Sequence, residues 1–305
     1  MPLETLLQDI GDSDKRLSTT QLASLSDMDS EDTRALTEAW PEFEVNRRFA
    51  IVQEMIELAH DNVDLNFDAV YKIALSDDEA AVRAAALRGL IEYERRDLIP
   101  VLIDLLLTDE DADVRREAAI VLGRFALACE LGQFGDEEER RVRQALIESA
   151  EDTEEDERVR ARALEALGAL SGDDTENLIE SIYDEDSLWL KVGAVDAMGR
   201  SANAMWVPVV LRETESRAPE MRHAAAFALG EIGEEEAIPR LRRMAIEDPD
   251  REVRLAAVHS LGEIGGSTAR VALQGVLYEA PEGLEDAVQE ALEEIAFNED
   301  PFGSL

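Results

Sequence analysis

The chain has 305 residues, of which 45% are hydrophobic, and its 70 acidic and 30 basic side chains give a formal net charge of −40. A field of this sign repels phosphate backbones and anionic lipid surfaces, so the composition argues against nucleic-acid binding and favours a basic partner. Cys129 is the only cysteine, which excludes an intrachain disulfide and fits a reducing compartment. No apolar run is long enough to span a membrane and no secretory signal is recognised, so we expect a cytoplasmic protein without membrane insertion.

Residues 1–64 predict a helical cap that is continuous with the rest of the chain. Short helices are expected over residues 3–10, 18–25 and 31–40, and a longer one over 45–59. Terminal units of repeat proteins are atypical because they cover an otherwise exposed end of the core. A cap is therefore the favoured interpretation, and a separate element that docks a partner is the alternative.

One phrase, roughly V-R-x-x-A-A-x-A-L-G, recurs through residues 65–297. Its copies begin at Val82, Val114, Val159, Leu190, Met221 and Val253, with a weaker copy at Leu284. The steps between them are 32, 45, 31, 31, 32 and 31 residues. Periods of this size are typical of a solenoid, in which no single unit can bury its apolar face alone. We predict about seven repeats, followed by a C-terminal cap and a flexible tail at 298–305.

Residues 235–264 show how one repeat is built. Apolar residues three and four apart predict a first helix over 235–246, with Pro239 in its first turn, where a missing N–H costs least. A second helix is expected over 253–264 and ends at a Gly-Gly pair. The sequence contains no sustained alternation of β-branched residues, so no strand is predicted. The fold class is therefore all-α, a right-handed α-α superhelix of paired helices.

The step of 45 residues indicates an insertion near residues 125–140. The helix is expected to continue past Gly123 and to be followed by a loop at 132–135. The acidic run at 151–157 comes shortly after it. A charge run is usually a solvated loop, and a docking site for a basic partner is the alternative.

An acidic residue precedes most copies of the phrase by three or four positions, where it can cap the second helix. These residues are Asp78, Asp111, Asp156, Asp186 and Asp250.

The repeat resembles the HEAT repeats, and specifically their short, bacterial, phycobilisome-lyase-like subgroup. The resemblance rests on Ala237-Ile238-Pro239-Arg240-Leu241 in the first helix, and on Asp250, Val253-Arg254, Ala257-Val258, Leu261-Gly262 and Ile264-Gly265 in the second. It covers roughly residues 65–297 and implies an all-α solenoid. Such repeats serve scaffolds, lyases and other enzymes alike, so the resemblance by itself does not choose among functions.

The resemblance also implies a structural role for the basic residue of the phrase. In HEAT proteins this position usually pairs with the acidic row between helices and locks one repeat onto the next. Here the basic row is Arg83, Arg115, Arg160, Lys191, Arg222 and Arg254, matched to the five Asp residues named above. We therefore expect an Arg/Asp ladder that holds the repeats together.

The second helices of HEAT solenoids line the concave surface, so the variable positions of the phrase predict the ligand side. In the C-terminal half they assemble a patch of Val192, His223, Phe227, Leu255 and His259, rimmed by Asp196, Glu231 and Glu263. Exposed apolar clusters of this kind mark contact sites. The alternative is that curvature or a neighbouring repeat covers these side chains.

Enzymatic chemistry finds little support in the sequence. His223 and His259 lie on adjacent repeats, but the His-Glu pairs of related iron-dependent hydroxylases are absent, as are nucleophile motifs and phosphate loops. We expect no catalytic residue, metal or cofactor. The favoured function is a non-catalytic scaffold that binds a protein in its concave groove or through its acidic loops, with a basic segment as the candidate partner. A bilin lyase or tetrapyrrole chaperone is the alternative implied by the resemblance, and a metal-dependent HEAT-repeat enzyme is the second alternative.

Overall fold

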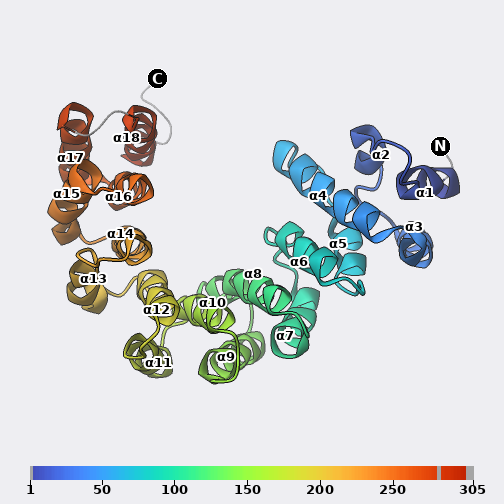
Figure 1. Ribbon diagram of the computed structural model, residues 1–305, viewed down its shortest axis with the longest axis horizontal. Coiled ribbons are helices and arrows are strands. Elements are labelled where there is room, and N and C mark those ends of the chain that lie inside the picture. The colour runs from blue at the N-terminus through green and yellow to red at the C-terminus, as the bar shows by residue number, and fades with distance from the viewer. Residues whose placement is uncertain (1–2, 280–282, 300–305) are drawn as a thin grey trace. The chain divides into compact units, whose positions relative to one another are not determined.

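The computed structural model describes residues 3–279 and 283–299 (Figure 1). Contacts divide the chain into two compact units, Met1–Ala145 and Leu146–Leu305. Helices joined by turns make up the described residues, and no strand occurs among them. The predicted all-α class is confirmed.

Unit 1 contains the predicted cap and the first repeats. Its helices are α1 (Leu3–Gly11), α2 (Thr19–Ala23), α3 (Ser30–Ala39), η1 (Trp40–Glu42), α4 (Val45–Asp61), α5 (Asp68–Ala74), α6 (Ala80–Gly89), η2 (Arg96–Leu98), α7 (Ile99–Thr108), α8 (Ala112–Glu130) and the start of α9 (Asp136–Glu151). Two buried side chains tie the cap to the turn before α6. The Trp40 indole N–H donates to Asp77 Oδ2 at 2.7 Å, and Arg48 Nε lies 2.9 Å from the same oxygen.

Unit 2 stacks helix pairs in two layers. Its helices after α9 are α10 (Glu157–Gly168), α11 (Asp173–Tyr183), α12 (Leu188–Arg200), η3 (Ala204–Trp206), α13 (Val207–Glu213), α14 (Pro219–Ile232), η4 (Glu235–Ala237), α15 (Ile238–Glu247), α16 (Arg251–Ile264), α17 (Gly266–Glu279) and α18 (Glu285–Glu299). The second helices, α10, α12, α14, α16 and α18, form one layer, in which each contacts the next. Within this unit they follow the concave side of the curve, and α11, α13, α15 and α17 lie outside them (Figure 1).

The glycine that ends the phrase explains how closely the second helices stack. In four successive repeats it faces a small residue of the next second helix, and these pairs are Gly168–Ala197, Gly199–Ala228, Gly230–Ser260 and Gly262–Ala291. A Cβ at Gly230 would lie only 2.7 Å from Ser260 Cβ and 2.9 Å from its Cα. The buried Ser260 hydroxyl is satisfied by Ala226 O at 2.8 Å. The A-x-A-L-G part of the phrase therefore places small residues where consecutive second helices meet, so that their backbones come very close together.

Acidic capping occurs at three of the five expected residues. Asp250 Oδ1 accepts from the amides of Glu252 at 2.9 Å and Val253 at 3.3 Å, and Asp111 and Asp156 accept from the first amides of α8 and α10. Each carboxylate satisfies orphan donors at the positive end of a helix dipole.

The two other expected caps are wrong. Asp78 instead accepts from Arg48 Nη2 at 2.7 Å, and the N-cap of α6 is Glu79, whose side chain makes no capping bond. The N-cap of α12 is Ser187 rather than Asp186, and the Ser187 hydroxyl accepts from the Leu190 amide. Asp78 is therefore engaged in an ion pair with Arg48, and the Ser187 hydroxyl caps α12 in place of Asp186.

The basic row does join consecutive repeats, but through a different acid. Arg222 Nε and Nη2 donate to the two oxygens of Asp248 at 2.7 and 2.8 Å, and its Nη1 donates to Ser216 O at 3.1 Å. The Asp248 carboxylate also accepts from the Asp250 amide at 2.9 Å. One guanidinium thus holds the turn of its own repeat to the turn of the next. The expected partner, Asp250, is occupied by capping.

Arg83 and Arg160 bridge consecutive turns in the same way, and Arg115 and Arg254 bind a carbonyl of their own turn. Arg83 binds Asp109 at 2.7 Å rather than Asp111, and Arg160 binds Glu185 at 2.7 Å rather than Asp186. Arg115 and Arg254 reach the turn carbonyls Asp109 O and Asp248 O at 2.6 and 2.7 Å. Lys191 makes no ion pair among the described residues, because Ser216 stands in the following turn where other repeats carry an acid.

The insertion and the chain end differ little from expectation. Helix α8 extends to Glu130 and α9 begins at Asp136, with a ring contact of 5.7 Å between Phe125 and Phe134 across the intervening loop. Most side chains of the acidic run 151–157 are exposed. The predicted tail at 298–305 overlaps α18, which continues to Glu299, and residues 300–305 lie outside the described part.

Replacing Gly230 with Ala should lower the free energy of unfolding by about 1–3 kcal/mol, because the new methyl group would overlap Ser260. Gly275→Ala is the matched control, since its Cβ would meet only the flexible Arg242 side chain, and alanine favours a helix. Urea unfolding followed by circular dichroism measures both. Equal stability of the two variants would contradict the close-stacking account.

Removing the Asp248 carboxylate in Asp248→Ala should cost about 2–4 kcal/mol, because it leaves the largely buried Arg222 guanidinium unpaired. Glu215→Ala removes an exposed partner of Arg240 and should cost less than about 1 kcal/mol. The same unfolding measurement compares them, and a similar small loss in both would show that the ladder contributes little.

Candidate functional site

Three rows of side chains run across the second helices of unit 2. The third, seventh and eleventh positions of the phrase lie about one helical turn apart on the same face of each helix. The third position reads Ala161, Val192, His223 and Leu255; the seventh reads Glu165, Asp196, Phe227, His259 and Glu290; the eleventh reads Ala169, Arg200, Glu231, Glu263 and Glu294. Most of these side chains border two adjacent hollows in the inner face.

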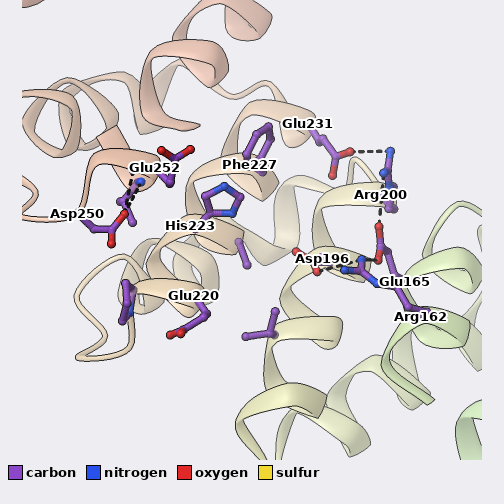
Figure 2. Close-up of a pocket in the computed structure, with 14 residues that line it drawn as sticks. Arg162, Glu165, Asp196, Arg200, Glu220, His223, Phe227, Glu231, Asp250 and Glu252 are labelled. Atoms are coloured by element: carbon purple, nitrogen blue, oxygen red, sulfur yellow. Dashed lines mark hydrogen bonds and ion pairs between the residues drawn. The ribbon is translucent and has the colours of Figure 1, made fainter. Parts of the chain in front are cut away.

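The first hollow, of about 470 Å³, is lined by α10, α12, α14 and α16. Figure 2 shows a chain of opposite charges along one side of it. Arg200 lies 2.8 Å from Glu231 Oε1 and 3.5 Å from Glu165 Oε1. Arg162 pairs with Glu165 and lies 3.9 Å from Asp196 Oδ2. The first hollow therefore supplies bases for its own acids along this side.

Asp196 is a largely buried acid of this charge chain. Burial is the main cause that raises the pKa of its carboxyl group to about 7; the neighbouring Glu165 and Glu231 raise it further and Arg162 opposes them. Burial likewise raises the pKa of Glu231, against the effect of Arg200. Burial lowers the pKa of His223, so this imidazole is neutral at pH 7.

An aromatic row separates the two hollows. The Phe227 ring centroid lies 4.8 Å from that of His223 on the same helix and 5.3 Å from that of His259 on α16. The rings meet at 52° and 50°, and both His223 and Phe227 line the first and the second hollow. These side chains are partly exposed, so curvature does not cover them completely.

The second hollow, of about 730 Å³, has a different character. Apolar and aromatic groups of α14, α16 and α18 form its floor, among them Phe227, Leu255 and Phe297. Its carboxylates are Glu252, Glu290, Glu293 and Glu294. No Lys or Arg occurs among its described lining residues. Glu252 pairs with Arg251, which lies outside the lining, at 3.2 Å. This hollow therefore combines accessible apolar surface with the three glutamates of α18, and neither Lys nor Arg lines its described part.

Seven of the eight residues of the predicted patch line one hollow or the other: Val192, Asp196, His223, Phe227, Glu231, Leu255 and His259. Glu263 stands beside them, with its Oε1 3.7 Å from His259 Nε2. Three residues of the first hollow were not predicted as site residues, namely Arg162, Glu165 and Arg200. Glu165 and Arg200 occupy the same rows as the predicted patch. It also missed Phe297, which lies beyond the phrase, where its periodicity gives no signal.

Two further observations concern metal-ligating and thiol side chains of the described residues. Among residues 3–279 and 283–299, no group of three or more His, Cys, Asp or Glu side chains is placed to hold a metal ion. The Cys129 thiol is buried, which is the main cause that raises its pKa to about 11 and keeps it protonated.

Helices long and apolar enough to cross a bilayer are absent from the described ranges.

Stacked helix pairs, close glycine contacts and the turn-to-turn arginines together define an α-solenoid. A family model described as HEAT repeats matches residues 67–128 and 207–293. Over these two ranges the chain matches the HEAT repeats, and its solenoid is similar to HEAT-repeat proteins.

Its relatives differ widely in length and role. A HEAT repeat-containing taxis protein of Halobacterium salinarum is 30% identical over 163 residues, which cover 52% of this chain and 34% of that protein. The phycocyanin lyase complex of CpcE and CpcF from Nostoc sp. PCC7120 has a TM-score of 0.55 at 16% identity, covering 93% of this chain and 97% of that one. Yeast importin-beta, Kap95p, has a TM-score of 0.55 at 15% identity, covering 96% and 46%. At these identities the two structures show a shared fold.

Substituting Asp196 with Asn should raise the free energy of unfolding by about 1–3 kcal/mol at pH 8. The folded state holds the Asp196 proton up to a pH of about 7, whereas the unfolded chain releases it near 3.8, so ionisation favours unfolding as the pH rises. The gain should therefore be complete above pH 7 and fade as the pH falls towards 4. Urea unfolding across this range measures it.

Glu263→Gln, an exposed carboxylate in an adjacent row, is the control and should change little. If the gain in the free energy of unfolding for Asp196→Asn does not vary with pH, it does not come from ionisation of the buried Asp196 carboxyl group.

Proposed function

We propose that this chain is a non-catalytic scaffold that binds a basic protein segment in the inner face of unit 2. The observation that carries the proposal is the second hollow, where Phe227, Leu255 and Phe297 are accessible beside carboxylates without basic partners in the lining. Apolar clusters left accessible on a monomer are typical of contact sites, and a negative field selects positively charged partners. The net charge of −40 extends that field and speeds encounter with such partners.

The relatives support a binding role. A second structure of Kap95p, with a TM-score of 0.52, concerns its binding to RanGDP, so a solenoid of this fold binds another protein. The Halobacterium relative is named as a taxis protein, and the chain spans about a third of its length. A role in taxis is therefore one context in which a scaffold of this kind would act. The exposed run at 151–157 is an alternative docking element for the same basic partner.

The likeness to phycocyanin lyase supports a second candidate, tetrapyrrole binding, because nearly the whole of both chains aligns. Mixing the protein with bilin or haem tests this directly. An unchanged tetrapyrrole absorbance spectrum would eliminate the candidate, and a shifted spectrum that disappears with groove variants would favour it over the scaffold.

Affinity capture from the source lysate tests the scaffold, with the double variant His223→Asp/Phe227→Ser compared with the unaltered chain at low and moderate salt. We expect a basic protein to be captured by the unaltered chain and lost by the variant, because the aromatic row is removed. Val271→Ser/Tyr278→Ser changes two exposed apolar residues of α17 outside both hollows and should retain capture. Mass spectrometry identifies the captured protein.

Helicity and melting temperature should be nearly unchanged in both variants. Equal capture by all three proteins would place the binding surface elsewhere, and the 151–157 acids neutralised to Gln or Asn would then be tested in the same assay. A collapse of stability in His223→Asp/Phe227→Ser would show that these residues are core.

A further inference from the structure

The two hollows differ in how their charges are balanced. In the first, Arg162 and Arg200 each lie within 4 Å of two carboxylates. In the second, Glu290, Glu293 and Glu294 line the space together with apolar residues and no Arg or Lys is among its described lining residues; the fourth acid, Glu252, pairs with Arg251 outside the lining at 3.2 Å. Burying an apolar occupant there would also bring these carboxylates out of water, which is costly unless the occupant supplies positive charges.

We propose that the second hollow receives one amphipathic helix of a partner protein, whose apolar face lies on Phe227, Leu255 and Phe297 and whose flanking Lys or Arg residues meet the surrounding glutamates. This inference rests on the proposed function and names the kind of segment that the scaffold binds.

The shape of the hollow suits a helix face. Alanines at 256, 287 and 291 leave room between the larger Phe227, Leu255 and Phe297 side chains. A volume of about 730 Å³ lies in the range of clefts that bury a drug-sized ligand, which is comparable to several apolar side chains of one helix face. Apolar residues at helical spacing fill grooves between helices in this way.

The backbone of the occupant also selects a helix. The walls of the second hollow belong to α14, α16 and α18, whose main-chain groups bond within their own helices, and the described residues contain no strand edge. An extended segment would therefore bury N–H and C=O groups without partners, whereas a helix satisfies them internally.

The charges lie where such a helix would be flanked. Glu290, Glu293 and Glu294 come from the middle of α18, and Glu252 comes from the first turn of α16, where Arg251 lies 3.2 Å from its Oε1. Acids therefore border the apolar residues from two helices.

A synthetic 18-residue helix with leucines on one face and lysines on the other, labelled with fluorescein, is the probe for fluorescence anisotropy with the full chain. We expect saturable binding that weakens as salt increases. Two further peptides isolate the features that matter. One has the same composition in scrambled order, and the other carries glutamate in place of lysine. Both should bind at least about tenfold more weakly, because they lack the apolar face or the positive charge.

A charge-matched pair of variants locates the binding. Glu290→Gln/Glu293→Gln/Glu294→Gln should weaken the leucine-lysine peptide by about tenfold. The control Glu234→Gln/Glu235→Gln/Glu236→Gln removes the same charge from exposed residues of unit 2 outside the hollow and should change binding less than about twofold. Leu255→Asp should also weaken binding, and circular dichroism verifies that each variant is folded.

Equal weakening by the two triple variants would overturn the proposal, because the total field and not the hollow would then be responsible. Equal binding of the scrambled peptide would overturn the amphipathic helix. If no peptide binds but lysate capture still depends on His223 and Phe227, the scaffold function survives and this inference fails. If both assays are negative, the scaffold function fails too.

Discussion

The close approach of consecutive second helices is the constraint on which the rest of the structure depends. Gly199 against Ala228, and Gly230 against Ser260, leave no space for a side chain between adjacent helices. Because this contact repeats once per unit, equivalent positions of the phrase are carried forward in register from one helix to the next. The three rows of the inner face, and therefore both hollows, exist because the helices stack at this distance.

The turn-to-turn arginines hold the same register from the other end of the repeat. Arg222 spans its own turn and Asp248 of the next, while the neighbouring Asp250 remains free to cap α16. Two acids two residues apart thus perform different tasks, one between repeats and one within a helix. Lys191 followed by Ser216 is a natural interruption of this ladder, so inter-repeat coupling is uneven along unit 2.

Because the net charge is −40, the two hollows are best distinguished by whether basic residues lie beside their acids. The first hollow contains its own counter-ions, and Asp196 is largely desolvated within it at a cost to stability above pH 7. The second hollow shares the aromatic wall of His223 and Phe227 but provides no base in its lining. In the proposed scaffold, binding at such a site depends on matching charge as well as apolar shape.

The sequence by itself determined the all-α class and the helix pairs, because both follow from local periodicity. The caps at Asp111 and Asp250 followed from an acid placed just before the second helix, and the patch around Phe227 was predicted from the resemblance to HEAT repeats. Only the tertiary structure decided that Arg83 binds Asp109 rather than Asp111, since both acids are near in sequence and only their orientation towards the next repeat separates them. It alone brought Phe297 into the second hollow and Arg200 between two carboxylates. Spacing along the chain specifies which face a side chain occupies, whereas its neighbours on other helices depend on how the repeats stack.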